Sequence, residues 1–170
     1  MKDIRFFMAL TFVLLGMLSF YSSFCQDSGT SFFSVEGEVL RSLNLSVNDL
    51  HKLKSTELKA KDKDGTEHNF KGVSLSEVLD SAGVTLGNQL RGANLAKYVL
   101  VQATDGYEVV FSLPEIDPEF SNEQILLAYQ VDGRALQPHD GPFRLVVPSD
   151  KKHARWIRQI KTIKVLFSKS

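Results

Sequence analysis

Three of the four Asp-Gly pairs divide the chain into short runs of strand-forming residues; these three stand at residues 64–65, 105–106 and 132–133. The first lies inside ELKAKDKDGTEHNF, the second joins KYVLVQA to YEVVFSL, and the third follows QILLAYQV. Aspartate and glycine both tolerate the positive φ that tight hairpin turns require. The pairs therefore predict antiparallel strands joined by short turns.

Short helices are predicted between these strands. FSVEGEV (33–39) alternates as a strand does, and Ser46 with Asp49 three residues later indicates a short helix that runs through Leu50 and Leu53.

A second helix is predicted over LSEVLDSA, where Ser74 and Glu77 form a capping box and Gly83 follows the last turn. FRLVVP (143–148) is typical of a short strand buried on both faces. Because strands and helices alternate without a regular βαβ period, the predicted class is mixed α+β with largely antiparallel strands.

The first 25 residues have the pattern of an export signal. Lys2 and Arg5 precede an apolar run from Phe6 to Phe24, and small residues flank a cleavage position after Cys25. No paired arginines precede the run, so the twin-arginine route is not indicated and the chain is expected to cross unfolded. The protein is predicted to be exported, either periplasmic or secreted.

Cleavage there gives a mature chain with a flexible segment, 26–34, and one domain, 35–170. An uncleaved anchor and a lipid on Cys25 are alternatives, and only these would attach the protein to a membrane. Cys25 is the only cysteine, so the mature domain has no thiol for a disulfide, a metal or catalysis.

Charge is unevenly distributed along a chain of zero net charge. Residues 105–132 hold seven acids and no lysine or arginine, and the acids at 115, 117 and 119 are interpreted as a solvated edge in a loop with two prolines. Residues 139–170 hold eight lysines or arginines against two aspartates. This imbalance favours a local anion site and argues against general nucleic-acid binding.

Possible anion ligands gather in HDGPFRLVVPSDKKHARWIRQIKTIKVLF, residues 139–167. Two prolines stiffen the turn that holds His139 near Arg144, while Arg155 and Arg158 share a side if their turn is helical. Trp156 between them could cover a ligand ring or fill the core. Composition alone favours a simpler reading, in which the isoleucines point inward and the cations face solvent.

Other catalytic and metal-binding patterns are missing from the sequence. The four histidines show no metal-ligand spacing, and neither a phosphate-binding glycine loop nor a GxSxG nucleophile turn occurs. We therefore predict no metal site and no catalytic residue.

The order of four blocks is more specific than any one of them. GVSLSEVLDSAGV, AKYVLVQATDGYEVVFSLPEI, ILLAYQVDGRAL and HDGPFRLVVPSDKKHARWIRQIKTIKV follow one another between Gly72 and Val165. Together they resemble the molybdopterin-binding domain of the sulfite oxidase family, with weaker similarity back to Val35. The resemblance implies a mixed α+β unit built around a pterin cofactor.

By the same resemblance, His139 lies where a histidine or asparagine contacts the cofactor, and Arg144 lies where an arginine contacts its phosphate side. Arg155, Trp156 and Arg158 fall in a closing anion loop. Family enzymes hold molybdenum through a cysteine that precedes the Gly72 block, whereas the corresponding region here has only a hairpin around Ala60. Molybdopterin is thus possible by resemblance and is expected to be absent.

Three functions stay open. The first is an exported, non-catalytic domain that keeps an anion cradle for a phosphate- or carboxylate-bearing ligand or a partner protein. The second is a molybdopterin-dependent oxidoreductase, or the cofactor-binding part of one. The third is a structural or interaction module without a small ligand. No nucleic-acid partner is expected.

Overall fold

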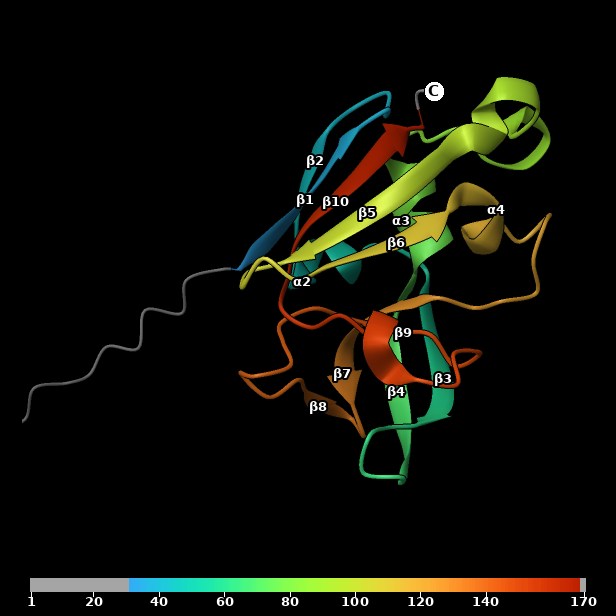
Figure 1. The fold of residues 1–170 in the computed structure, drawn as a ribbon. Helices are drawn as coiled ribbons and strands as arrows, with labels where there is room; N and C mark the ends of the chain where they lie inside the picture. Colours follow the sequence, from blue (N-terminus) through green and yellow to red (C-terminus); the bar gives the residue numbers. More distant parts are fainter. Residues whose placement is uncertain (1–30, 169–170) are drawn as a thin grey trace, which may run out of the picture.

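The computed structural model describes residues 31–168, which form two five-stranded sheets set one above the other (Figure 1). The upper sheet has the order β2-β1-β10-β5-β6. Its neighbours are antiparallel except for β1 and β10, which are parallel. The bounds of these strands are β1 Phe32–Gly37, β2 Leu43–Ser46, β5 Lys97–Ala103, β6 Glu108–Ser112 and β10 Ile160–Phe167.

The lower sheet has the order β3-β4-β7-β8, with β9 also paired to β7, and all its pairs are antiparallel. Its strands are β3 Ser55–Lys61, β4 Glu67–Ser74, β7 Leu126–Val131, β8 Arg134–Ala135 and β9 Arg144–Val146. The three Asp-Gly pairs at residues 64–65, 105–106 and 132–133 lie in turns between paired antiparallel strands, as the sequence predicts. In the third turn Asp132 and Gly133 both have positive φ, at 49° and 74°.

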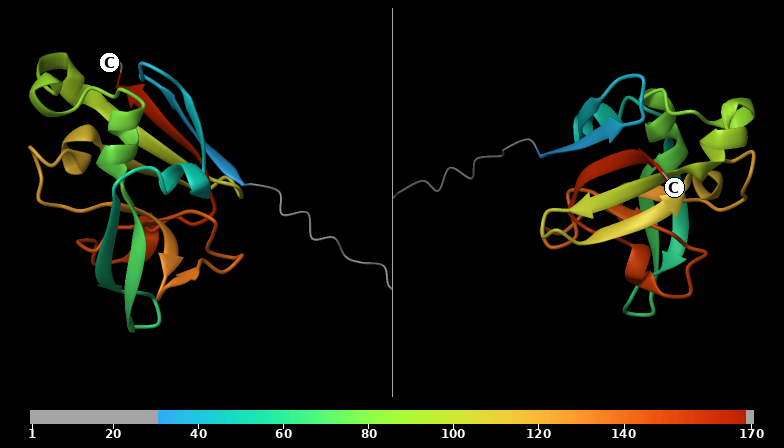
Figure 2. Two further views of the ribbon diagram at one scale, coloured as in Figure 1. Left: turned by 180° about the vertical axis from the view of Figure 1, so that it is seen from behind. Right: turned by 45° about the horizontal axis from the view of Figure 1, so that its top comes forward.

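Short helices connect the strands, and α3 lies on the side of the upper sheet that faces the viewer when the molecule is seen from behind (Figure 2, left). Ser46 and Asp49 form the predicted capping box of α2, which ends at Leu50 and so is shorter than expected. The Ser74 hydroxyl accepts a hydrogen bond from Glu77 N at the start of α3. The helical elements are α2 Val47–Leu50, α3 Leu75–Ser81 and α4 Leu113–Ile116, with 3-10 turns η2 Gly87–Gln89, η3 Gly92–Ala96 and η4 His153–Arg155.

The core follows from strand alternation. Every second residue of β5 is buried, and the same holds for the first four residues of β6, so one face of the upper sheet packs inward. Gly72 marks the closest approach of β4 to β7, since a Cβ built there would lie 2.1 Å from the carbonyl oxygen of Leu127. Any side chain at residue 72 must therefore push two strands apart.

Two expectations from the sequence are wrong. β1 begins at Phe32, inside the segment 26–34 that was expected to be flexible, because Phe33 is fully buried and packs edge-on against Phe143 at 4.8 Å. The acids after β6 do not form a solvated edge either. Asp117 is 1% exposed, and its carboxylate accepts hydrogen bonds from the backbone N–H groups of Gly87 and Glu119.

The predicted export signal and Cys25 lie outside the described residues. Within residues 31–168, no helix is long and apolar enough to cross a membrane.

A basic cleft between the two sheets

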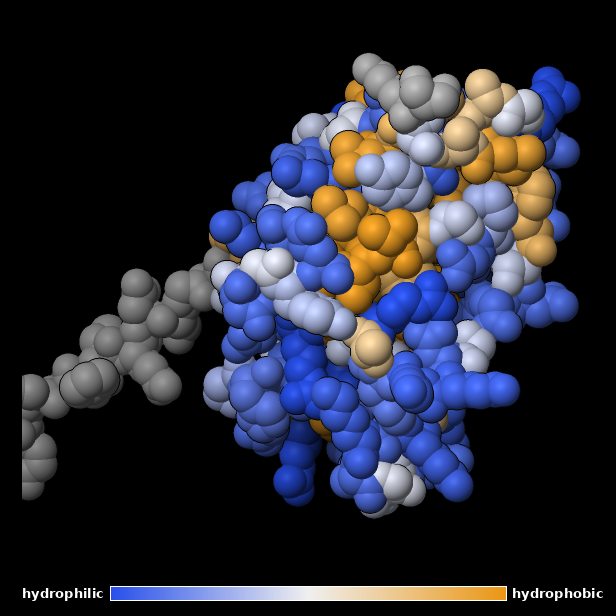
Figure 3. Space-filling model, viewed as in Figure 1, coloured by the Kyte–Doolittle hydropathy of each residue, from blue (hydrophilic) through white to orange (hydrophobic). Residues whose placement is uncertain are grey.

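The candidate site is a cleft of about 260 Å³ where loops of the two sheets meet. The β5–β6 turn forms one wall, and the β3–β4 turn, the loop before β9 and the segment from η4 to β10 form the others. In the space-filling view, apolar surface gathers over β5 and β6, whereas the lower part of the molecule is hydrophilic (Figure 3). We call this site the basic cleft; its polar and aromatic residues are Lys63, Asp105, Tyr107, His139, His153, Trp156 and Arg158.

Arg144 lies behind the cleft, and both its terminal nitrogens are engaged by its own chain. Its side chain is 2% exposed, and its terminal nitrogens donate to the two carboxylate oxygens of Asp62 at 2.8 and 3.3 Å. The guanidinium also packs over the rings of Phe70 and Trp156, at 5.3 and 5.6 Å from their centroids. Burial opposes ionisation of Asp62, but hydrogen bonds from Arg144 and from Lys63 N outweigh it and hold the pKa of Asp62 below its ordinary value.

Asp140 lies among two arginines and a histidine. Its carboxylate is 2.8 Å from Arg158 Nε, 3.7 Å from an Arg144 terminal nitrogen and 3.6 Å from His139 Nε2. The Arg158 contact has the distance of an ion pair without the alignment of a hydrogen bond. One carboxylate thus faces two guanidinium groups.

Among the described residues, the buried side-chain atoms without a hydrogen bond all belong to Asp140 and its two arginine neighbours. Three buried side-chain atoms in residues 31–168 lack a hydrogen-bond partner, and they are Asp140 Oδ1, Arg144 Nε and Arg158 Nε. Two of these atoms, Asp140 Oδ1 and Arg158 Nε, still lie 2.8 Å apart as an ion pair, so their charges are paired although their alignment is poor.

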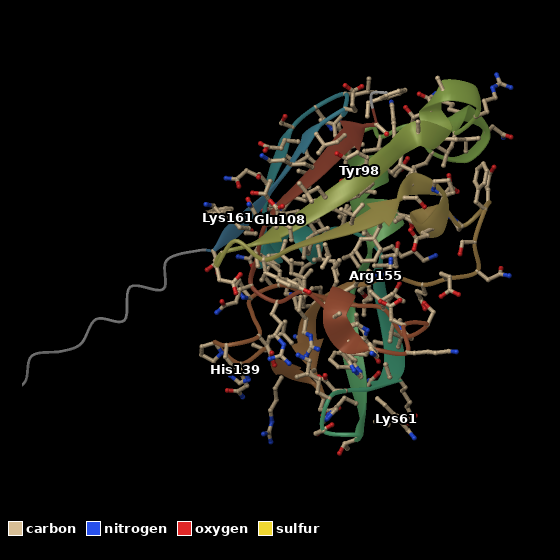
Figure 4. The ribbon with its side chains drawn as sticks, viewed as in Figure 1. Lys61, Tyr98, Glu108, His139, Arg155 and Lys161 are labelled. Atoms are coloured by element: carbon tan, nitrogen blue, oxygen red, sulfur yellow. The ribbon has the colours of Figure 1, made fainter. Side chains whose placement is uncertain are left out.

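Arg155 points away from the cleft. It donates to both carboxylate oxygens of Asp150, at 2.9 and 2.6 Å, and to Glu115 at 2.9 Å, with its guanidinium over the ring of Phe111. These partners raise the pKa of Arg155. Figure 4 shows Arg155 and His139 on opposite sides of η4.

The predicted shared helical face of Arg155 and Arg158 is therefore wrong. The 3-10 turn η4 ends at Arg155, so Arg158 lies beyond it and faces Asp140 instead. Trp156 is 3% exposed and donates from Nε1 to the carbonyl oxygen of Val147, so it fills the core while its edge lines the cleft.

Gln159 fixes the backbone next to Arg158. It has a positive φ of 49°, its side chain donates to the Pro138 carbonyl at 2.8 Å, and its own carbonyl accepts from Thr104 N at 3.0 Å. A non-glycine residue in this conformation is strained and persists only where surrounding contacts compensate. Here those contacts join the β5–β6 turn to the loop that carries His139.

A second cavity, of about 300 Å³, adjoins the basic cleft and shares Lys63 and Arg158 with it. We call it the side pocket. Its charges nearly balance, because four carboxylates face three permanent cations and one histidine; the charged and titratable residues are Asp62, Asp64, Asp132, Asp140, Lys63, Arg144, Arg158 and His68. The basic cleft holds a single carboxylate, Asp105, and so is the better place for an anion.

The structure thus brings together two of the residues expected from the sequence, His139 and Arg158, and places Arg144 and Trp156 behind them. Two other cleft residues, Lys63 and His153, were not expected. Lys63 lies at the Asp-Gly turn of the first hairpin, so the turn pattern was the only available signal. His153 donates from Nε2 to the carbonyl of Lys61 at 2.8 Å and packs edge-on to Trp156.

The architecture is therefore that of a mixed α+β domain with a basic cleft at the junction of two sheets. The sequence profile of the oxidoreductase molybdopterin binding domain matches residues 25–169, and the chain belongs to this family, as its sequence blocks indicate. Among curated protein sequences, none is significantly similar to this chain.

A solved structure shares the fold. The crystal structure of the sulfane dehydrogenase SoxCD from Paracoccus pantotrophus superposes with a TM-score of 0.62 at 19% identity. The similarity covers 79% of this chain and 37% of that chain, so this chain spans well under half of its structural relative. The predicted fold class is confirmed.

Proposed function

We propose that this protein is an exported, non-catalytic member of its family, which binds a phosphate- or carboxylate-bearing ligand in the basic cleft. The observation that carries the proposal is that some cationic side chains are neutralised by carboxylates of the chain and others are not. Carboxylates of the chain neutralise Arg144 and Arg155, whereas Arg158 has only a carboxylate, Asp140, that also lies near Arg144. Among the described residues the ammonium of Lys63 has no hydrogen bond or ion pair. Positive charge is thus left where a small anion can reach it.

The family's cofactor fits these residues poorly. Molybdenum in the family has a cysteine ligand by resemblance, and residues 31–168 contain no cysteine. Ala60 occupies the matching region as a buried residue of β3, opposite His68 of β4. Nor does the described part of the chain hold a group of three histidines, aspartates or glutamates that could bind a metal ion.

Asp62 adds a second obstacle, because it lies two residues after Ala60 and occupies both terminal nitrogens of Arg144. An arginine that is held in this way and is only 2% exposed offers little of its guanidinium to a cofactor phosphate. We therefore assign no redox step to this chain.

The first experiment separates a binding domain from an oxidoreductase. Protein purified from its native exported fraction is assayed for molybdenum and for the fluorescent oxidation product of the pterin. Neither is expected above background. Stoichiometric amounts of both would overturn the proposal and leave the oxidoreductase reading in its place.

The second experiment tests the basic cleft. Sulfate and inorganic phosphate are titrated into the purified protein, with calorimetry and the fluorescence of Trp156, the only tryptophan, as readouts. We expect a Lys63→Gln, Arg158→Gln variant to bind at least about tenfold more weakly than wild type, since two charge-assisted contacts are lost.

The matched control is a Lys151→Gln, Lys152→Gln variant, which removes the same charge from two exposed residues that do not line the basic cleft. Its affinity should stay within about twofold of wild type at moderate salt. Equal loss in both variants would show a diffuse charge effect, and negligible binding by wild type would favour a module without a small ligand.

A further inference from the structure

His68 lies between the turns of two hairpins. Its Nδ1 is 2.7 Å from a carboxylate oxygen of Asp132 in the β7–β8 turn, and its Nε2 is 3.1 Å from one of Asp64 in the β3–β4 turn. Its ring packs edge-on to Phe70 below it. One imidazole therefore joins two loops that are far apart in the sequence.

This geometry requires a charged ring. Ionised carboxylates only accept hydrogen bonds, and a neutral imidazole has a single N–H, so it can satisfy Asp64 or Asp132 but not both. Both contacts exist together only when His68 is an imidazolium. The same two hydrogen bonds raise the pKa of His68.

Protonation of His68 changes the charge balance of the side pocket. With the ring protonated, positive and negative side chains nearly balance. Loss of that proton leaves Asp62, Asp64, Asp132 and Asp140 facing only Lys63, Arg144 and Arg158. Arg144 is already held by Asp62. Arg134, outside the pocket, also acts electrostatically on Asp132. The cations that can respond are the two shared with the basic cleft, Lys63 and Arg158.

We propose that protonation of His68 regulates anion binding in the basic cleft. The imidazolium holds Asp64 and Asp132 away from Lys63 and Arg158, so that Asp140 is the carboxylate that an anion must displace from Arg158. The neutral ring releases Asp64 and Asp132 to compete for the same cations. Anion affinity is therefore higher at mildly acidic pH. This inference rests on the proposed function, since it concerns the regulation of the same cleft.

Thermodynamic linkage supplies the test. If protonation of His68 strengthens anion binding, bound anion must raise the pKa of His68 by the equivalent amount. The ring of His68 is titrated by NMR between about pH 5 and pH 8 with saturating sulfate, which stays a dianion throughout, and again with sodium chloride at equal ionic strength. We expect sulfate to raise the pKa of His68 by about half a unit or more, equivalent to at least about a threefold change in affinity.

We call the contacts of His68 with Asp64 and Asp132 the latch. An Asp132→Asn variant shows whether sulfate raises the pKa of His68 through the latch or through its own negative charge acting directly on the ring. Asparagine can still accept the Asn69 N–H that Asp132 Oδ1 binds, but it carries no charge to compete for Lys63. The sulfate-induced rise should shrink to less than half in this variant. His51, which contacts Tyr129 rather than a carboxylate, serves as the internal control and should not respond.

Each possible result of these titrations supports or overturns the regulation by His68. Sulfate that saturates the Trp156 fluorescence but leaves His68 unmoved would overturn the latch and spare the proposed function. A rise that persists in Asp132→Asn would also overturn it, because a direct field would then be the cause. Absence of sulfate binding to wild type would overturn the proposed function and the latch together.

Discussion

Arg144 and Asp62 face each other across 82 residues of sequence, and both terminal nitrogens of the guanidinium are within 3.3 Å of the carboxylate. The pair is almost completely withdrawn from solvent on the arginine side, at 2% exposure, and partly so on the aspartate side, at 16%. Arg144, which the sequence suggests for ligand binding, thus has a structural partner, Asp62, in the turn between β3 and β4. The pair ties β9 to the β3–β4 turn within the lower sheet.

Removing one member of this pair should cost more than removing both. We expect Asp62→Asn to lower the free energy of unfolding by about 3 kcal/mol, since it leaves a buried, uncompensated guanidinium. An Asp62→Leu, Arg144→Met double variant should recover at least about half of that loss. Urea unfolding followed by Trp156 fluorescence measures both values.

The control for this cycle is Lys52→Ala, which removes an exposed ion pair to Asp49 and should cost less than about 1 kcal/mol. Strict additivity of the two single substitutions at residues 62 and 144 would contradict a coupled buried pair.

Asp140 competes with any anion for Arg158. Replacing it by asparagine frees Arg158 from an ion pair at 2.8 Å and removes negative charge from the side pocket next to the cleft, so Asp140→Asn should bind sulfate about threefold to tenfold more tightly. Calorimetry at fixed ionic strength measures the change. An unchanged or weaker affinity would mean that the anion does not contact Arg158.

Stability should fall at both ends of the pH range. Asp62 and Glu115 have pKa values held below the ordinary range mainly by Arg144 and Arg155, against the opposing effect of burial, so their contribution is present above the unfolded pKa and lost as pH falls through the folded one. His68 has the opposite sign. Its pKa is raised, so its contribution is complete below about pH 6.5, the unfolded value, and is lost as pH rises through the folded value.

The His68 part of this prediction is tested by urea midpoints of wild type and His68→Gln. The difference between the two proteins should be largest near pH 5.5 and should shrink towards about pH 9. A difference independent of pH would indicate that His68 contributes by packing on Phe70 and not by charge.

Gly72 is a position where a single methyl group should matter strongly. A Cβ there would lie 2.1 Å from the Leu127 carbonyl oxygen, so Gly72→Ala should destabilise the protein by about 3 kcal/mol or more, or prevent folding. Gly106→Ala is the comparison, because residue 106 has open space and a φ of 87°, and only conformational strain of about 1 kcal/mol applies. Equal costs at the two sites would contradict steric contact between β4 and β7.

Local features of this fold were predictable from the sequence, because a short stretch of chain determines them. The Asp-Gly turns, the alternation of β5 and the caps at Ser46 and Ser74 each depend on neighbouring residues. The ordered blocks also indicated the family. The site was less predictable, since a run of cations does not show which of them meets a carboxylate from elsewhere in the chain.

Arg155 illustrates the limit. Its partner Glu115 is 40 residues away, and the pairing depends on how α4 packs beside η4. Lys63 has no such partner among the described residues, and no pattern in the sequence indicated that it lines the cleft. It does so because the β3–β4 turn and the β5–β6 turn, which belong to different sheets, meet there. Only the tertiary structure distinguishes cations used internally from those that remain for a ligand.

The place of β10 has a consequence for the order in which the protein can fold. β10 is the last described strand, yet it lies in the middle of the upper sheet, between β1 and β5. A chain that emerges from its N-terminus, from a ribosome or through a translocation channel, can form the β1–β2 and β5–β6 hairpins early but cannot join them until residues 160–167 arrive. The upper sheet thus stays in two separate parts until the last described strand has been delivered.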